Sequence, residues 1–171
     1  NPTRAAFERN IASLENGTRG FAFASGLAAV DAILRMLNPG DEVITSKNLY
    51  GGTYRMFTQL FQKQGIRFHF IDFEELSQIN TYISNKTRLV WLETPTNPLL
   101  KIVDIEAIAK LVKKDRPEII LAVDNTFATP YLQKPLDLGA DIVMHSVTKY
   151  LGGHSDIMMG AVVVKDETLA K

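Results

Sequence analysis

The chain has 171 residues, enough for one domain with a substantial core, and its 19 basic residues balance 19 acidic ones. This balance, without a long charged run, argues against nucleic acid or a membrane surface as the main partner. The sequence has no cysteine for disulfides or thiolate metal sites, no apolar run of roughly 20 residues and no signal-peptide pattern, so we expect a soluble, cytoplasmic protein.

Hydrophobic periodicity predicts short strands that alternate with helices along the first half of the chain. The strands are expected at residues 20–23, 42–45 and 66–71. The helices are expected over residues 3–16, with Thr3 as the cap and Gly17 at the end, from Ser25 to Leu37, and over a stretch around Phe57 that Gly65 ends.

The second half continues this alternation. Helices are expected around Ile79 and directly after Asp104, which is a suitable capping residue. Several of the predicted strands are apolar throughout, which is typical of a parallel sheet covered on both faces. The sequence therefore predicts an α/β fold with a mainly parallel sheet flanked by helices. The strands of this half are expected at residues 88–93, 119–124, 142–144 and 158–164.

The candidate site residues are those that directly follow the predicted strands. In an open α/β sheet, ligands bind beyond the carboxyl ends of the strands. The usual glycine-rich dinucleotide and nucleotide fingerprints are absent from the sequence. The segments in the expected position are Ser25–Leu27, Lys47–Tyr50, Thr94–Asn97, Asp124–Thr126 and Ser146–Lys149.

Lys149 follows an apolar strand and two hydroxyl residues, Ser146 and Thr148. Burial and neighbouring charge lower the pKa of a lysine, and the free amine can form a Schiff base with an aldehyde. The two hydroxyl groups are suited to hold a phosphate beside it. Because Ser-x-Thr-Lys is a weak signal when taken alone, an ordinary loop lysine is the alternative interpretation.

Two further segments have a ligand-binding interpretation. Gly26 and Leu27 begin a predicted helix, whose free amides and dipole suit a phosphate; ordinary helix capping is the alternative. Asp124 ends the most apolar strand, where a carboxylate needs a partner such as a protonated pyridine nitrogen; a capping aspartate is the alternative. Thr126 could contact the same ring or serve only in the turn.

Residues of the loops contribute an aromatic ring and polar groups. Tyr50 precedes two glycines, and its ring could stack on a flat cofactor while its hydroxyl transfers protons. Arg55 could bind a substrate carboxylate, and Asn97 could hydrogen-bond the cofactor. For each of the three, a surface or turn residue without a ligand is the alternative.

The three histidines, His69, His145 and His154, are not spaced as metal ligands on one element, so we expect them to be structural or supporting groups and expect no metal site. The other signals point to a phosphate, an aromatic ring and an aldehyde. Pyridoxal phosphate (PLP) is a ligand that combines all three.

Several motifs resemble those of the Cys/Met metabolism family of PLP-dependent enzymes, which includes cystathionine γ-lyase, γ-synthase and β-lyase and methionine γ-lyase. The resemblance covers essentially the whole chain. It implies the type I, aspartate-aminotransferase-like fold. The motifs that carry it are Asn1-Pro2-Thr3, Ser25-Gly26, Tyr50-Gly51-Gly52-Thr53, Glu93-Thr94-Pro95-Thr96-Asn97-Pro98, Val123-Asp124-Asn125-Thr126-Phe127, Ser146-x-Thr148-Lys149-Tyr150 and Gly153-His154-Ser155-Asp156.

The resemblance also implies a role for each candidate. Lys149 would form the Schiff base with PLP and then move protons, and Asp124 would pair with the pyridinium nitrogen. Tyr50 would stack on the ring and assist the incoming substrate amine, and Arg55 would lie near the substrate. The phosphate would be bound by Gly26, Leu27, Ser146 and Thr148, with Thr126 and Asn97 close to the ring.

Members of this family are longer than this chain. Residues 1–171 are therefore expected to be part of the PLP-binding large domain, without the N-terminal arm that reaches a neighbouring subunit and without the C-terminal domain that binds the substrate α-carboxylate. The resemblance implies a homotetramer with sites shared between chains. Whether residues 1–171 bind PLP alone is left open.

The implied function is that of a PLP-dependent carbon–sulfur lyase of transsulfuration. It would cleave cystathionine by γ-elimination to cysteine, 2-oxobutanoate and ammonia. The alternatives are a γ-synthase, which adds cysteine to an activated homoserine ester, then a β-lyase, and outside this class a truncated domain without catalysis. Gly52 occupies a position where methionine γ-lyases typically have cysteine, which argues against that activity.

Overall fold

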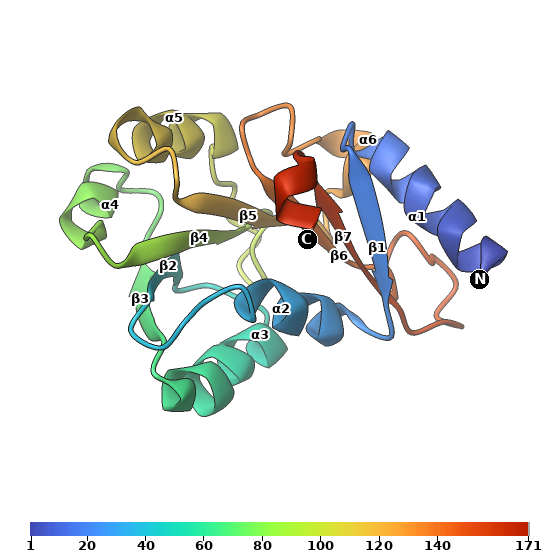
Figure 1. The fold of residues 1–171 in the computed structure, drawn as a ribbon, viewed down its shortest axis with the longest axis horizontal. Helices are drawn as coiled ribbons and strands as arrows, with labels where there is room; N and C mark the ends of the chain where they lie inside the picture. Colours follow the sequence, from blue (N-terminus) through green and yellow to red (C-terminus); the bar gives the residue numbers. More distant parts are fainter. Residues whose placement is uncertain (171) are drawn as a thin grey trace.

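The computed structural model describes residues 1–170, and within them seven strands form one sheet in the order β1-β7-β6-β5-β4-β2-β3 (Figure 1). The strands agree with the predicted ones to within two residues at most ends. They are β1 (Arg19–Phe23), β2 (Glu42–Ser46), β3 (Arg67–Ile71), β4 (Thr87–Glu93), β5 (Ile120–Asp124), β6 (Ile142–Ser146) and β7 (Gly160–Val164).

The sheet is parallel except at β7. Strands β3, β2, β4, β5 and β6 pair in parallel, whereas β7 runs antiparallel between β6 and β1. Strand β1 therefore points the same way as β6, and the carboxyl ends of six strands lie along one edge. This confirms the predicted mainly parallel α/β sheet, and the site candidates are gathered at that edge.

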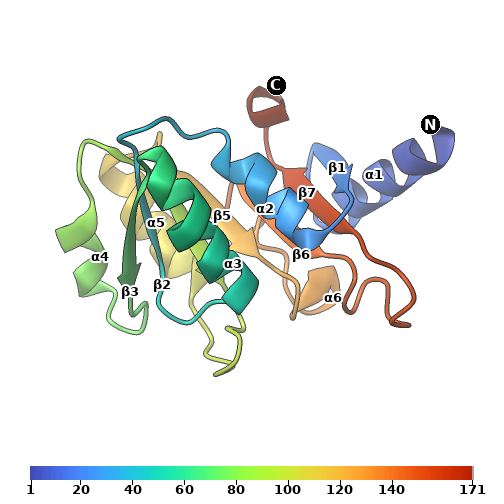
Figure 2. The same ribbon diagram turned by 90° about the horizontal axis from the view of Figure 1, so that it is seen from below.

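Helices cover both faces of the sheet, as Figures 1 and 2 show from two directions. Helices α2 and α3 pack with one apolar cluster, and α1, α4 and α5 pack with a second cluster on the opposite face. Burial on both faces explains why β2 and β7 have no exposed residue. The helices are α1 (Pro2–Leu14), α2 (Gly26–Leu34), α3 (Gly51–Met56), α4 (Ser77–Tyr82), α5 (Ile105–Asp115) and α6 (Thr129–Leu132).

Some helix boundaries differ from the prediction. Asn1, not Thr3, caps α1, because its side chain accepts hydrogen bonds from the backbone N–H groups of Thr3 and Arg4. The single long helix expected around Phe57 is α3 followed by a π-helical segment (Phe57–Phe61) and a short 3-10 segment (Gln62–Gln64). Helix α6 and a final 3-10 turn (Glu167–Ala170) were not predicted.

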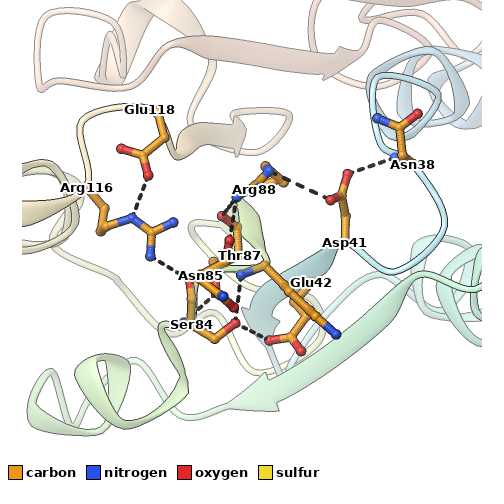
Figure 3. Close-up of polar contacts among 10 residues, drawn as sticks. Asn38, Asp41, Glu42, Ser84, Asn85, Thr87, Arg88, Arg116 and Glu118 are labelled. Carbon is orange, nitrogen blue, oxygen red and sulfur yellow. Dashed lines mark hydrogen bonds and ion pairs between the residues drawn. The ribbon is translucent and has the colours of Figure 1, made fainter.

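The amino ends of the parallel strands carry a polar network of their own (Figure 3). Glu42, the first residue of β2, accepts a hydrogen bond from the Ser84 hydroxyl at 2.8 Å, forms an ion pair with Arg67 and contacts a ring nitrogen of His69. The carbonyl of Ser84 in turn accepts from Arg116 at 2.6 Å. This network lies at the edge opposite the candidate site and ties together the starts of β2, β3 and β4.

None of the helices formed by residues 1–170 combines the length and the hydrophobicity that spanning a membrane requires.

Candidate active site

A cavity of about 600 Å³ lies at the carboxyl ends of the strands. Nine of the ten predicted site residues line it, although they come from segments up to 123 positions apart in the chain. They are Gly26, Leu27, Tyr50, Asn97, Asp124, Thr126, Ser146, Thr148 and Lys149. The tenth, Arg55, is exposed on α3 and does not line the cavity, because the buried side of this helix is formed by Gly52, Thr53 and Phe57.

Lys149 lies in the turn after β6. The backbone N–H of Lys149 donates to the carbonyl of Ser146 at 3.0 Å. The N–H of Gly153 donates to the carbonyl of Lys149 at 2.7 Å. Among the described residues no carboxylate forms an ion pair with its side chain, and it also borders a second cavity of about 440 Å³. The backbone of Lys149 is thus held by the turn, while its amine is free to meet a ligand.

Asp124 is held by the turn that follows β5. Both the backbone N–H and the hydroxyl of Thr126 donate to Asp124 Oδ1, at 3.0 and 2.5 Å. Burial raises the pKa of the Asp124 carboxyl, and these two hydrogen bonds oppose the rise. Within residues 1–170 both bonds go to Oδ1, which leaves Oδ2 as an acceptor for an N–H donor in the cavity.

Thr126 also links Asp124 to the lysine-bearing segment. Its hydroxyl oxygen accepts a hydrogen bond from the backbone N–H of Ser146 at 2.8 Å. One hydroxyl therefore connects the end of β5 with the end of β6. The predicted proximity of Thr126 to the other candidates is explained by this bridging position.

The start of α2 lies against the end of β6. A β-carbon on Gly26 would be 2.8 Å from Ser146 Cβ and 3.0 Å from Ser146 Oγ, so only glycine allows this approach. Ser25 caps the helix by accepting from Ala28 N–H at 3.1 Å, and the first amides of a helix have no partner within it. The cavity is therefore lined by helix-start amides beside a hydroxyl group, an arrangement suited to an anion.

Tyr50 lies over the glycine two residues ahead of it. A β-carbon on Gly52 would be 2.4 Å from Tyr50 Cε1, whereas one on Gly51 would have no heavy atom within 4 Å. The ring lines the cavity with 43% of the residue exposed. Its position thus depends on the absence of a side chain at Gly52.

Glu93 is a cavity residue to which the sequence reasoning assigned no role. It is the last residue of β4, is only 5% exposed, and lies beside Asp124 in the register of β4 and β5. Burial and the neighbouring Asp124 charge raise the pKa of Glu93 to about 8. The sequence did contain a pattern that singles out Glu93, because this residue ends an apolar strand just as Asp124 does.

A buried polar cluster lies on the other face of the sheet behind the cavity. His145 Nε2 is 2.5 Å from Glu15 Oε1, and the side-chain amide of Asn125 donates to the same oxygen at 2.9 Å. Glu15, His145 and Asn125 are each completely buried. The expectation that His145 is a structural or supporting group agrees with this position between α1 and β6.

Comparison with known proteins identifies the family to which the chain belongs. The family described as Cys/Met metabolism PLP-dependent enzyme matches residues 1–171. The chain belongs to this family of pyridoxal-phosphate-dependent enzymes.

The individual relatives have different activities. The chain is 53% identical, over its whole length, to a cystathionine gamma-synthase/O-acetylhomoserine (thiol)-lyase of Bacillus subtilis, covering 45% of that protein. It is 51% identical to a cystathionine beta-lyase of Coxiella burnetii, with 100% of this chain and 44% of the relative covered. It is also 51% identical to a cystathionine gamma-lyase of Dictyostelium discoideum, with 99% and 43% covered. The chain thus spans less than half the length of these relatives.

The solved structures agree with this assignment. The fold superposes on cystathionine gamma-lyase from Lactobacillus plantarum, complexed with L-serine, with a TM-score of 0.97 and 49% identity, covering 99% of this chain and 44% of that one. For metB from Corynebacterium glutamicum the TM-score is 0.95 and the identity 47%, with the same coverage. These matches confirm the predicted PLP-dependent transferase-like fold.

The residues of this cavity fit the cofactor of the family. The close approach of Gly26 to Ser146 brings the helix-start amides and the serine hydroxyl to one side of the cavity, where they suit an anionic phosphate. Asp124 Oδ2 suits a ring N–H, and the unpaired amine of Lys149 suits an aldehyde. Each chemical feature of PLP therefore has a matching group in one cavity.

Proposed function

We propose that this chain forms the cofactor-binding part of a PLP-dependent carbon–sulfur lyase that cleaves cystathionine by γ-elimination, giving cysteine, 2-oxobutanoate and ammonia. The observation that carries the proposal is that Lys149, Asp124 and the start of α2 line one cavity. Membership of the Cys/Met metabolism family supports the choice of cofactor and of sulfur amino acids as the substrate class.

In this proposal each group of the cavity has a task. The Lys149 amine attaches the cofactor and later carries protons between substrate carbons, for which its position in the turn after β6 is suited. Asp124 Oδ2 accepts from the ring nitrogen and keeps it protonated. The amides of Gly26 and Leu27 bind the phosphate together with the hydroxyls of Ser146 and Thr148. When bound, PLP supplies an electron sink for the substrate α-carbon.

The remaining cavity residues orient the ring and the substrate. The ring of Tyr50 lies on the cavity wall, where it can stack on the cofactor and its hydroxyl can accept a proton from the substrate amine. Asn97 and Thr126 line the same cavity and would lie beside the ring. Arg55, at the exposed surface of α3, can contribute only to the outer approach of a substrate. A homotetramer that shares sites between chains, in the cytoplasm, remains part of the proposal.

Cofactor attachment is tested by borohydride reduction of the purified protein with PLP, followed by peptide mass spectrometry. We expect the pyridoxyl group on Lys149 and on no other lysine, and we expect Lys149→Ala to abolish the label. A label on another residue, or no label on the wild-type protein, would overturn the assignment. Lys165→Ala is a matched control, because Lys165 lies outside the cavity.

γ-Replacement is the second candidate, because the 53% identical relative from Bacillus subtilis is a γ-synthase and O-acetylhomoserine (thiol)-lyase. Product analysis separates the reactions. Cystathionine gives cysteine and 2-oxobutanoate by γ-elimination, or homocysteine and pyruvate by β-elimination. An O-acylhomoserine with cysteine gives cystathionine by γ-replacement. A higher kcat/KM for the ester than for cystathionine would replace our first choice by the second.

A further inference from the structure

The carboxyl group of Glu93 holds two loops of the cavity at once. Glu93 Oε2 accepts from the backbone N–H of Tyr50 at 2.9 Å, and Glu93 Oε1 accepts from that of Asn97 at 2.8 Å. Tyr50 directly precedes α3, and Asn97 lies in the loop between β4 and α5. Each oxygen of one carboxyl thus fixes the backbone of a residue that lines the cavity.

Two acids lie side by side in this cavity. Glu93 and Asp124 are register partners on adjacent parallel strands, so their side chains project from the same face of the sheet. The other titratable groups that line the cavity with them are Lys149 and Tyr50, and His145 acts on Asp124 from the opposite face. Two carboxyl groups on adjacent strands oppose each other's ionisation, because both carry the same charge when ionised.

Glu42 is a second carboxyl group with little solvent exposure, but its neighbours differ from those of Glu93. Glu42 and Glu93 are each 5% exposed and each belong to a central strand. Hydrogen bonds from Ser84 and His69 overcome the effect of burial and lower the pKa of Glu42. No ion pair of the described residues involves Glu93, and its pKa is raised to about 8 by burial and by Asp124.

We propose that Glu93 is a positioning residue whose ionisation is coupled to the charge placed against Asp124. When a cationic ring nitrogen neutralises Asp124, the repulsion between the two acids is removed, and Glu93 loses its proton at a lower pH than in the cofactor-free protein. Its two oxygens then accept fully from the N–H groups of Tyr50 and Asn97 and hold both residues beside the ring. This inference rests on the proposed placement of the cofactor nitrogen at Asp124.

The proposed coupling predicts the direction in which the cofactor affinity changes with pH. Glu93 is protonated in the cofactor-free protein below about pH 8, and it releases that proton when the cofactor binds. The release of one proton makes the cofactor affinity rise about tenfold for each pH unit between the pKa of Glu93 in the cofactor-bound protein and its pKa in the cofactor-free protein. Other groups also contribute to the change of cofactor affinity with pH. The coupling is therefore measured as the difference in slope between the wild-type protein and a Glu93 variant.

The test is a titration of cofactor binding by absorbance at several pH values between 6 and 8, after Lys149 has been identified as the attachment site. Glu93→Gln cannot ionise, so we expect its affinity to rise about tenfold less per pH unit than that of the wild-type protein. Glu42→Gln, the matched control, should keep the wild-type slope. Equal slopes for Glu93→Gln and the wild type would overturn the coupling.

The Glu93→Asp variant distinguishes the charge of the Glu93 side chain from its length. It keeps a carboxylate beside Asp124, so we expect it to keep the wild-type slope. Its shorter side chain cannot reach both N–H groups, so the visible circular dichroism of the bound cofactor should fall. Unchanged circular dichroism in both Glu93 variants would overturn the positioning role. A wild-type protein that carries no cofactor on Lys149 would instead refute the proposed function, so the two failures are distinguishable.

Discussion

The ring of Tyr50 lies where a side chain of Gly52 would be, since a β-carbon there would stand 2.4 Å from Tyr50 Cε1. The two residues therefore form a pair in which the smaller one determines the position of the larger one. The pair bears on the proposed function because Tyr50 forms part of the wall of the cavity in which we propose that PLP binds.

The first prediction concerns this pair. Gly52→Ala should push the Tyr50 ring out of its position and weaken cofactor binding by about tenfold, a typical cost for losing one aromatic contact. Gly51→Ala is a matched control, because a β-carbon at Gly51 meets nothing within 4 Å. Absorbance titration with PLP measures both variants. Equal affinities for Gly52→Ala and Gly51→Ala would contradict the pairing.

The second prediction concerns the hydroxyl of Thr126, which joins Asp124 Oδ1 to the N–H of Ser146. Thr126→Val keeps the shape of the side chain but removes both hydrogen bonds. A hydrogen bond to a charged group contributes about 1.5–3 kcal/mol, so the cofactor affinity should fall at least tenfold. Thr126→Ser restores the hydroxyl and should recover most of the affinity. If the serine variant is as weak as the valine variant, the bridge is not the cause.

The third prediction concerns the buried pair of Glu15 and His145. Glu15→Ala leaves His145 and Asn125 without the partner they share, and each buried polar group left without a hydrogen bond costs about 1–3 kcal/mol. The free energy of unfolding in urea should fall by that amount. Glu106→Ala removes an exposed pair with Lys110 and should change it by less than about 0.5 kcal/mol. Similar losses in the two variants would be inconsistent with this cluster as a structural centre.

The fourth prediction concerns stability against pH in the cofactor-free protein. The pKa of Glu93 is about 8 in the folded state and ordinarily 4.5, so the folded state binds the extra proton. Its contribution to stability is present at low pH and is lost as the pH rises from about 4.5 to 8. Glu93→Gln should therefore flatten the pH dependence of the melting temperature in this window.

Glu42 gives the opposite sign in the same experiment. Its pKa is lowered in the folded state, so its contribution is present above its ordinary pKa and is lost as the pH falls through the folded value. Glu42→Gln should reduce the loss of stability in acid and leave the window from pH 6 to 8 unchanged. A flattened neutral window in Glu42→Gln would contradict the assignment of that window to Glu93.

The sequence predicted much of the fold, and it predicted candidate residues that the structure brings to one cavity, because strand ends are local features. Lys149 and Asp124 each follow an apolar run, and parallel strands bring such positions to one edge. The strand β7 was predicted but its antiparallel direction was not, since strand direction depends on pairing and not on composition. The link between Glu15 and His145 was missed for a similar reason, because it joins residues 130 positions apart.

Arg55 shows a limit of reasoning by motif. Its distance from Tyr50 along the chain suggested a role near the substrate, but its direction depends on the helix face that is buried. Gly52, Thr53 and Phe57 face the core, which turns Arg55 outward. Glu93 shows the converse, since it was quoted within a motif but had no predicted role until its two loop contacts were visible.

The antiparallel strand β7 also joins parts of the chain that are far apart in the sequence. Strand β1 is attached to the sheet only through β7, and a β-carbon on Gly160 of β7 would lie 2.1 Å from the carbonyl oxygen of Ser25. The start of α2, a predicted phosphate site, thus packs against β7 as well as against Ser146 of β6. Strand β7 carries none of the residues predicted to contact the cofactor, yet it helps to fix the helix start beside them from a part of the chain that follows Lys149.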